Sequence, residues 1–298
     1  MLSIYANTTS NNVFADQKQA IPPKIPKKKP IFNFEYGQKK FKYIDIKSYT
    51  VDFDLIKKKN YVNDYTKQPL KIDKEIGATK QVKNDCWLLT GVNALANTAI
   101  GKEYIRKSII SHNEKNTVVH FAGTNTTITI PKFVLGAAKQ SKSYVDGDDD
   151  MLAIELATEY YKKMLITNND TITKAGPNII TGKYSSGNLN DPLAGGFASD
   201  IMFLITGKRS KTIFNGKNRC PKKLKDAIEK KQNEPDKYAL TCNFKKAGNG
   251  LIIHHAYAIK KVDSKFVTVI NPHNSGKEEK IPINDFYKNV NSVTILNL

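Results

Sequence analysis

Three residue types that together perform thiol catalysis occur in order along this chain, as Cys86, His255 and Asn271. A cysteine attacks as its thiolate, a histidine takes and returns the proton, and a third group holds the imidazole in one tautomer. Cys86 precedes apolar residues at helical spacing, so we expect it at a helix N-terminus with Asp85 as the N-cap. There the helix dipole and free amides lower a thiol pKa. Because a lone cysteine opening a buried helix is more often a packing residue, the downstream residues decide.

The candidate base and its orienting group lie near predicted strands. Residues 253–259 alternate in the manner of a strand, so His254 and His255 are expected on opposite faces and only one can reach a given cleft. A later strand ends at Asn271, where an adjacent strand could hold the amide beside His255. His255 is therefore the predicted base, and Asn271 is the group that orients it.

The segments around these residues resemble the calpain-like cysteine peptidases. Residues 81–89, Gln-Val-Lys-Asn-Asp-Cys-Trp-Leu-Leu, are similar to the family's active-site cysteine segment, in which a glutamine precedes an Asp-Cys-Trp helix start. Residues 255–257, His-Ala-Tyr, look like its catalytic histidine strand, and Asn271-Pro272 looks like its asparagine segment. The resemblance extends over roughly residues 75–275 and includes weaker similarities at Gly195-Gly196 and Thr206-Gly207.

The resemblance implies a papain-like fold of two lobes, with the cysteine on a helical lobe and the histidine and asparagine on a β-rich one. It also implies an endopeptidase that cleaves protein peptide bonds through a thioester. Gln81 would then supply a side-chain donor to the oxyanion hole, beside the backbone amide of Cys86. The sequence departs from the family pattern in three places: Gln81 is one residue closer to the cysteine, His254 replaces a small residue, and His273 stands where a tryptophan shields the asparagine.

The elements expected to position these residues change in character along the chain. Helices are predicted from Cys86 for about 12 residues, then at 151–165, up to 205 and at 221–231. Strands are predicted in an early hairpin at 117–130, then at 238–244, 250–262, 266–270, 280–283 and 292–296. Because helices predominate first and strands last, the fold class is predicted to be α+β.

The domain organisation follows from the same pattern. Residues 1–45 are expected to be an irregular leader, a prosegment or a tether, because their prolines and lysines favour extended, solvated chain. Residues 46–298 would form the peptidase domain, with a helical lobe over about 75–232 and a β-rich lobe over about 235–298. Short strands or an arm are expected at 42–56, and a long loop at 166–198 that shapes the cleft.

The composition limits the partners. The chain has 298 residues, enough for one large domain or two lobes that share a cleft. Its 47 Lys and Arg against 28 Asp and Glu give a formal net charge of +19, which favours an acidic partner beside the protein or peptide substrate. Arg clusters, zinc spacings and aromatic RNA-binding signatures are missing from the sequence, so nucleic acid is not expected as the primary partner.

The cysteines and the apolar runs bear on the compartment. Cys86, Cys220 and Cys242 have no paired spacing, which favours a reducing compartment, and the latter two are interpreted as packing thiols. The protein would then be cytoplasmic, or it would be delivered to a cytoplasm without a signal peptide. No run approaches the roughly 18 apolar residues of a membrane helix, and no secretory signal is expected.

The proposed chemistry requires no cofactor, and one acidic segment leaves calcium open. Residues 146–150, Asp-Gly-Asp-Asp-Asp, offer carboxylate oxygens at alternate positions, which suit that ion. The segment lacks the glutamate that closes an EF-hand loop. A solvated helix N-terminus, where acids favour the helix dipole, is the preferred interpretation.

Two other functions fit the same residues. A thiol acyltransferase or an isopeptidase would use the same triad and the same thioester, and would differ in the acceptor and the cleft shape. A catalytically inactive papain-like module would instead bind an acidic partner through its basic surface.

Overall fold

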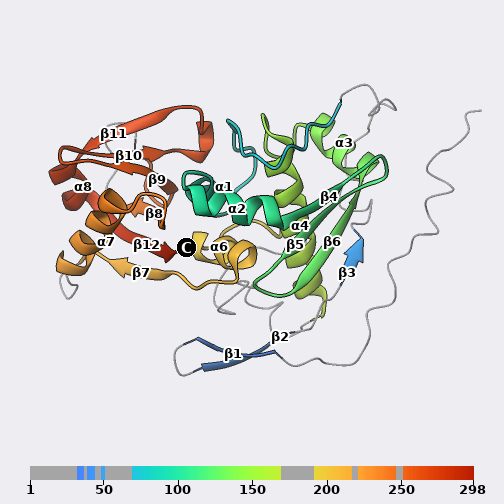
Figure 1. The fold of residues 1–298 in the computed structure, drawn as a ribbon, viewed down its shortest axis with the longest axis horizontal. Coiled ribbons are helices and arrows are strands. Elements are labelled where there is room, and N and C mark those ends of the chain that lie inside the picture. The colour runs from blue at the N-terminus through green and yellow to red at the C-terminus, as the bar shows by residue number, and fades with distance from the viewer. Residues whose placement is uncertain are drawn as a thin grey trace, which may run out of the picture.

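A computed structural model describes residues 32–36, 39–43, 48–50, 69–168, 191–216, 221–245 and 251–298 of the chain. Within these residues the protein belongs to the α+β class, as predicted, with helices and largely antiparallel sheets. Figure 1 shows the sheet built from the last part of the chain on one side and the sheet built from the earlier part on the other. Helix α1, which begins at Cys86, lies between them.

The later sheet has six strands in the order β11-β10-β9-β8-β12-β7, and each pair of neighbours is antiparallel. Its strands are β7 (Lys211–Phe214), β8 (Tyr238–Phe244), β9 (Ala256–Val262), β10 (Phe266–Ile270), β11 (Glu278–Pro282) and β12 (Val290–Asn297). Helices α7 (Pro221–Asn233) and α8 (Ile283–Asn289) pack against it. The predicted strands 238–244 and 266–270 are confirmed to the residue.

The earlier sheet has four strands in the order β3-β6-β5-β4. These strands are β3 (Ser48–Thr50), β4 (Ile109–His112), β5 (Asn116–Phe121) and β6 (Thr126–Pro131). The predicted hairpin at 117–130 is confirmed, because β5 pairs antiparallel with β6 around a turn in which Asn125 has a φ of 49°. Successive residues of both strands alternate between buried and half-buried, as a sheet with one covered face requires.

A separate antiparallel hairpin lies inside the segment predicted to be an irregular leader. Its strands are β1 (Phe32–Tyr36) and β2 (Lys39–Tyr43). The first 31 residues of the leader lie outside the described residues. So do most of the predicted arm at 42–56, most of the predicted loop at 166–198, and Cys220.

The helices around the site form one apolar core. They are α1 (Cys86–Ala96), α2 (Ala99–Ser108), α3 (Lys132–Ser141), α4 (Asp149–Asn168) and α6 (Ala198–Thr206). Every residue of α1 from Trp87 to Leu95 is buried, and a helix that is apolar all round must be covered on every side. It contacts α2, α4, α6 and the strands β8 and β9, so its N-terminus is held against the six-stranded sheet.

The predicted helices are found, and within the described ranges three further α-helices are not among the predictions. Helix α1 begins at Cys86 as expected, α4 is longer than 151–165 at both ends, and α7 begins at Pro221. Helix α2 could have been predicted from the sequence. Thr98 is an N-cap that accepts from the Gly101 amide, and basic residues occupy the last turn. Helices α3 and α8 follow β6 and β11 directly, so the strand pattern hides where each begins.

An extended segment, residues 69–80, leads to the site and is held by the first residues of α4. Asp149 accepts from the Lys71 amide at 2.6 Å, Asp150 from the Asp73 and Lys74 amides at 3.1 and 3.0 Å, and Asp148 from the Gly77 amide at 2.8 Å. The acidic segment does begin a helix, but the prediction that it is solvated is wrong, since Asp149 and Asp150 are buried. Their oxygens serve backbone amides of the extended segment.

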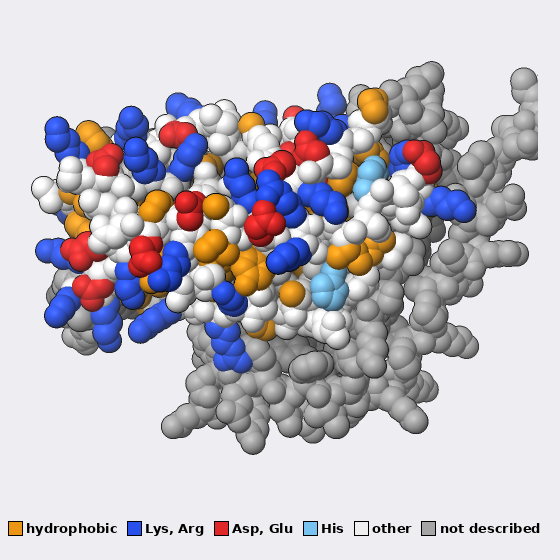
Figure 2. Space-filling view, viewed as in Figure 1, with side chains coloured by type: hydrophobic (Ala, Val, Ile, Leu, Met, Phe, Trp, Pro, Cys, Tyr) orange, Lys and Arg blue, Asp and Glu red, His pale blue; other side chains and the backbone are white. Residues whose placement is uncertain are grey.

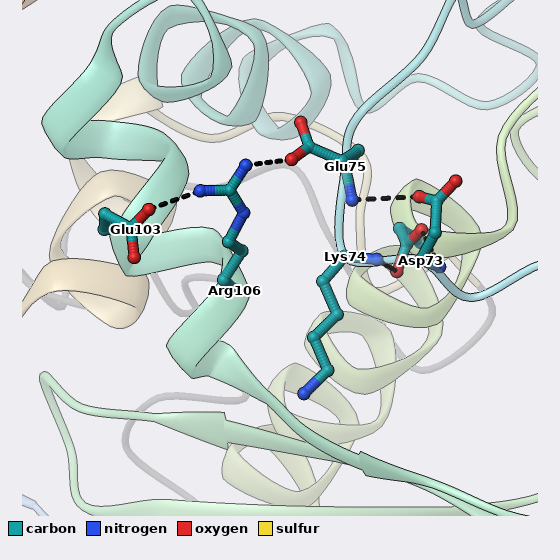
Figure 3. Close-up of polar contacts among 6 residues, drawn as sticks. Asp73, Lys74, Glu75, Glu103 and Arg106 are labelled. Carbon is teal, nitrogen blue, oxygen red and sulfur yellow. Dashed lines mark hydrogen bonds and ion pairs between the residues drawn. The ribbon is translucent and has the colours of Figure 1, made fainter.

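The same segment is also fixed to α2. Arg106 on α2 forms ion pairs with Glu103 of its own helix and with Glu75 of the segment (Figure 3). Asp73 in turn accepts from the Glu75 amide. The chain therefore approaches Cys86 along a path held by two helices.

The surface carries its charge widely. Figure 2 shows Lys and Arg side chains spread over the described part of the face in view, with Asp and Glu side chains between them. The basic side chains of the described residues therefore do not gather into one patch on this face. In the part of the chain that is described, no helix has the length and apolar composition needed to cross a membrane.

Candidate active site

Cys86 is the first residue of α1, and the helix begins there because the Asp85 carbonyl accepts the first helical hydrogen bonds. The Leu88 and Leu89 amides donate to it at 2.8 and 3.3 Å. Asp85 thus occupies the N-cap position as predicted, but its side chain makes no capping hydrogen bond. The two amides before these, those of Cys86 and Trp87, consequently remain open to other acceptors.

Backbone amides surround the half-buried Cys86 thiol. Burial raises its pKa, and the nearby Asp85 carboxylate adds to that effect. The nearby backbone amides of Ala256, Trp87 and Cys86 act in the opposite direction, because they favour the thiolate. Since the pKa remains above its ordinary value, the resting thiol is protonated at neutral pH and needs a base when it attacks.

The two histidines differ sharply, but for another reason than predicted. His254 has a φ of 56° and is exposed, whereas His255 is 6% exposed, and β9 begins only at Ala256. The prediction that both lie on a strand and alternate across it is therefore wrong. A left-handed turn at His254 redirects the chain and sends His255 inward.

Asn271 holds the His255 ring in one tautomer. The Asn271 Oδ1 atom lies 2.8 Å from His255 Nε2 and accepts from the His273 amide at 3.0 Å. Because a backbone amide can only donate, the side-chain atom that it contacts must be oxygen, so His255 Nε2 is the donor. The proton is then on Nε2, and Nδ1 keeps the basic lone pair. Among the described residues Nδ1 has no hydrogen-bond partner.

The surroundings of His255 keep the ring neutral. Burial lowers its pKa, the hydrogen bond to Asn271 raises it, and a nearby positive charge on His273 would lower it. The His273 ring stacks on His255 with centroids 4.5 Å apart and planes inclined by 14°. Tyr257 meets the same ring edge-on at 5.1 Å. A neutral, fixed imidazole is ready to accept a proton at pH 7.

Ala256 joins the base to the nucleophile. Its carbonyl accepts from Thr90 Oγ1 at 3.0 Å, and its amide lies on the side of the Cys86 sulfur, where it favours the thiolate. Cys86 and Thr90 are four residues apart and so share one face of α1. This face of α1 therefore lies against Ala256, the residue next to His255. Thr90 was not predicted from the sequence, where a threonine inside an apolar helix carries no particular signal.

A second link joins the two halves of the site. The Gln81 amide donates to the Pro272 carbonyl at 2.9 Å, directly after Asn271 in the short helix η3 (Pro272–Asn274). The Gln81 side chain donates from Nε2 to the Lys83 carbonyl at 2.6 Å, and its Oε1 is buried without a hydrogen-bond partner in the described structure. The predicted oxyanion donor is therefore near the site but turned to a carbonyl.

Residues 193–196 cross over Trp87, beside the nucleophile. Trp87 Nε1 donates to the Leu193 carbonyl at 2.9 Å, and a Cβ on Gly196 would lie 2.5 Å from the indole ring. This close approach explains why glycine stands there. Buried Lys162 donates to the Gly195 carbonyl at 3.3 Å, with its ammonium 5.1 Å from the Trp87 ring centre. Lys162 was missed, because one lysine in a helical stripe suggests no partner.

We expect Asn271→Ala to reduce turnover by roughly 10²-fold, because the imidazole loses its fixed orientation. The effect should be smaller than the loss of Cys86 or His255. Since the Asn271 hydrogen bond raises the pKa of His255, its removal lowers that pKa and moves the acid limb of the pH–rate profile to lower pH. Asn274→Ala, in the same short helix, is the matched control and should leave both quantities unchanged.

The other candidate ligands do not converge. Cys242 is buried in β8, and burial raises its pKa, which agrees with a packing thiol. Within the described ranges, no group of three or more His, Cys, Asp or Glu side chains has the arrangement of a metal site. The groups that do meet are His255 and Asn271, and Ala256, the residue next to His255, is bound by the helix that begins at Cys86. No model of a known protein family matches the chain, and a comparison with curated proteins finds no significant match.

Proposed function

We propose that this protein is a cysteine endopeptidase of the calpain-like kind, with Cys86 as nucleophile, His255 as base and Asn271 as the residue that orients the base. One observation carries the proposal: a buried imidazole, fixed by Asn271, lies next to Ala256, whose carbonyl accepts from Thr90 one turn into the helix that begins at Cys86. The order of the three motifs and the α+β architecture support a papain-like fold with two lobes. Protein or peptide chains are the proposed substrates.

The proposed reaction follows from the neutral resting pair. As the Cys86 sulfur attacks the scissile carbonyl carbon, His255 Nδ1 takes the thiol proton and the carbonyl oxygen becomes an oxyanion. His255 then gives this proton to the leaving amine as the carbon–nitrogen bond breaks, which leaves a thioester. Water attacks the thioester with His255 again as base, and the acid product and the thiol are released.

The start of α1 supports the oxyanion. The side chain of Asp85 does not cap the helix, so the Cys86 amide can donate to an oxygen bonded at the carbon under attack. A second donor is proposed from Gln81, whose Nε2 would leave the Lys83 carbonyl for the oxyanion. The unpartnered Oε1 atom supports this assignment, since the side chain pays little to leave a site that satisfies only one end of its amide.

Gln81→Ala is expected to lower kcat by about 10² to 10³, the usual cost of one oxyanion donor. The rate at which iodoacetamide alkylates Cys86 should stay close to that of the wild type, because alkylation forms no oxyanion. Asn84→Ala is the matched comparison, since Asn84 is the other uncharged amide before the nucleophile. If Gln81→Ala is harmless and Asn84→Ala shows the loss, the donor is Asn84.

A peptidyl probe with a thiol-reactive group tests the proposed function directly. We expect mass spectrometry to find the probe on Cys86 and not on Cys242, because Cys242 is buried and its pKa is raised. Labelling should disappear in His255→Ala and at pH values that protonate the imidazole. A wild-type protein that is not labelled selectively would be an inactive module, and its binding to acidic proteins would then be the function to measure.

The same reaction separates hydrolysis from acyl transfer. A peptidase gives a free carboxylate at the cleaved bond, and an added amine should not change the product. A thiol acyltransferase would give the amide of that amine, and an isopeptidase would cleave only substrates branched through a lysine side chain. The masses of the products distinguish the three activities.

A further inference from the structure

Two carboxyl groups lie buried behind the nucleophile, outside the proposed triad. Asp85 directly precedes Cys86, and Glu155 lies on α4, 70 residues further along the chain. Both side chains are fully buried, at 0% exposure. Fully buried acids are rare unless another group compensates their charge, so this pair requires an explanation.

The hydrogen bonds of the pair leave one arrangement that satisfies it. Glu155 Oε2 accepts from the Val145 amide at 2.7 Å, but Glu155 Oε1 and both carboxyl oxygens of Asp85 have no donor from any other described group. The two carboxyl groups face each other within hydrogen-bond reach. Oxygens of this kind are satisfied when one group keeps a proton and donates it to the other.

Burial and the hydrogen bond within the pair, rather than the surrounding charges, distinguish the group that keeps the proton. Lys83 favours the ionised form of both carboxyls, although it is itself paired with Glu159, whose charge opposes that of Asp85. Burial raises the pKa of Asp85 to about 6, and that of Glu155 well above its ordinary value. The hydrogen bond lowers the pKa of Asp85 and raises that of Glu155, so Glu155 donates and Asp85 accepts as the carboxylate.

This pairing changes what Asp85 does at the helix start. Aspartate is among the preferred N-cap residues, and its carboxylate would ordinarily accept from the second or third amide of the helix. Here those amides belong to Trp87 and Leu88, and the Asp85 side chain caps neither of them. The Leu88 amide donates instead to the Asp85 carbonyl at 2.8 Å, and the Trp87 amide lies near the Cys86 sulfur, where it favours the thiolate.

We infer that Glu155 is a positioning residue for the nucleophile: by donating its proton to Asp85, it withholds that carboxylate from the first turn of α1, so that the amides there serve the sulfur and the oxyanion. The inference rests on the proposed function. Glu155 is well held for this task, because Val145 adjoins Asp146, which pairs with Lys80 of the extended segment through two hydrogen bonds of 2.8 and 3.0 Å.

Three variants test the inference through the pH dependence of Cys86 alkylation by iodoacetamide. In Glu155→Leu, the Asp85 carboxylate loses its donor and turns to cap α1, so the alkylation midpoint should move up by about one pH unit and kcat should fall about tenfold. Glu155→Gln keeps a donor for Asp85 and an acceptor for Val145, and should match the wild type. In the double variant Glu155→Leu with Asp85→Ala, the competing carboxylate is gone and the midpoint should return.

This rescue separates positioning from a merely structural role. Replacing both members of a buried polar pair by apolar groups is often nearly neutral for stability, so the double variant should fold even if Glu155→Leu does not. Infrared spectra of the wild type, with glutamate isotopically labelled, should show the C=O band of a protonated carboxyl group at pH 7. That band should be missing in Glu155→Gln.

Each contrary outcome has one meaning. If wild-type Cys86 is not selectively alkylated, the proposed function fails. If it is alkylated, but the midpoint is the same in the wild type and in a folded Glu155→Leu, or is not restored in the double variant, the function stands and this inference is wrong. If the wild type shows no infrared band of a protonated glutamate carboxyl group at pH 7, the inference is also wrong, whatever the variants do.

Discussion

Replacing Cys86 with alanine is expected to abolish peptide hydrolysis and to leave the fold intact. No other described thiol is placed to take over, because Cys242 is buried in β8. Removing the nucleophile of a catalytic triad typically costs on the order of 10⁴ or more in kcat. Alanine has the best helix propensity and fits the half-buried first position of α1, so the melting temperature should change by only a few degrees.

The measurement is turnover of a peptide substrate together with thermal unfolding followed by circular dichroism. Cys242→Ala is the matched control, since it removes a thiol of the same type from the core of the six-stranded sheet. It should lower the melting temperature and leave turnover of the folded protein unchanged. Activity of Cys86→Ala at a tenth of the wild-type value or more would exclude Cys86 as the nucleophile.

The second large effect is expected from His255→Ala, which should be as damaging as Cys86→Ala. The alanine variant has no group to accept the thiol proton, and Asn271 loses the ring that it orients. The basic Nδ1 atom of His255 also controls the acid limb of the pH–rate profile. That limb should therefore disappear from whatever activity remains.

The neighbouring histidine gives the matched control. His254 is exposed and has a φ of 56°, a conformation that glycine adopts at little cost. His254→Gly should keep near wild-type turnover and stability, whereas His254→Ala should be mildly destabilised with its chemistry intact. An inactive His254→Gly together with an active His255→Ala would show that the base has been assigned one residue too far along the chain.

Local sequence patterns predicted much of the fold. Residues 238–244 and 266–270 form strands because β-branched and aromatic side chains suit a buried sheet, and the apolar stripe after Cys86 forms a helix because its spacing matches 3.6 residues per turn. The edge strand β7 was missed, since its four residues are mostly exposed and carry no alternation. Short elements at an edge are selected by their neighbour, here β12, and their own sequence says little.

In the site, too, some features follow from the sequence and others only from the tertiary structure. Periodicity placed Cys86 at a helix start, and two motifs proposed His255 and Asn271 as its partners. It was the turn at His254 that decided which imidazole faces inward, and a positive φ at a residue other than glycine has no reliable sequence signal. The tautomer of His255 likewise depends on the His273 amide, which identifies the oxygen of Asn271.

Asp85 shows most clearly how far the sequence alone predicts the site. Its local preference correctly predicts the N-cap position, because a short acceptor before an apolar helix favours that place. Its side chain nevertheless turns away to Glu155. Thr90 likewise donates a hydrogen bond to the carbonyl of Ala256, which lies 166 residues further along the chain. Sequence by itself determined the nucleophile-bearing helix and the strands near its proposed partners, since backbone sterics and burial periodicity act over a few residues. Only the tertiary structure decided which polar groups meet, because buried donors and acceptors must be satisfied by whatever distant segments the packing brings within reach.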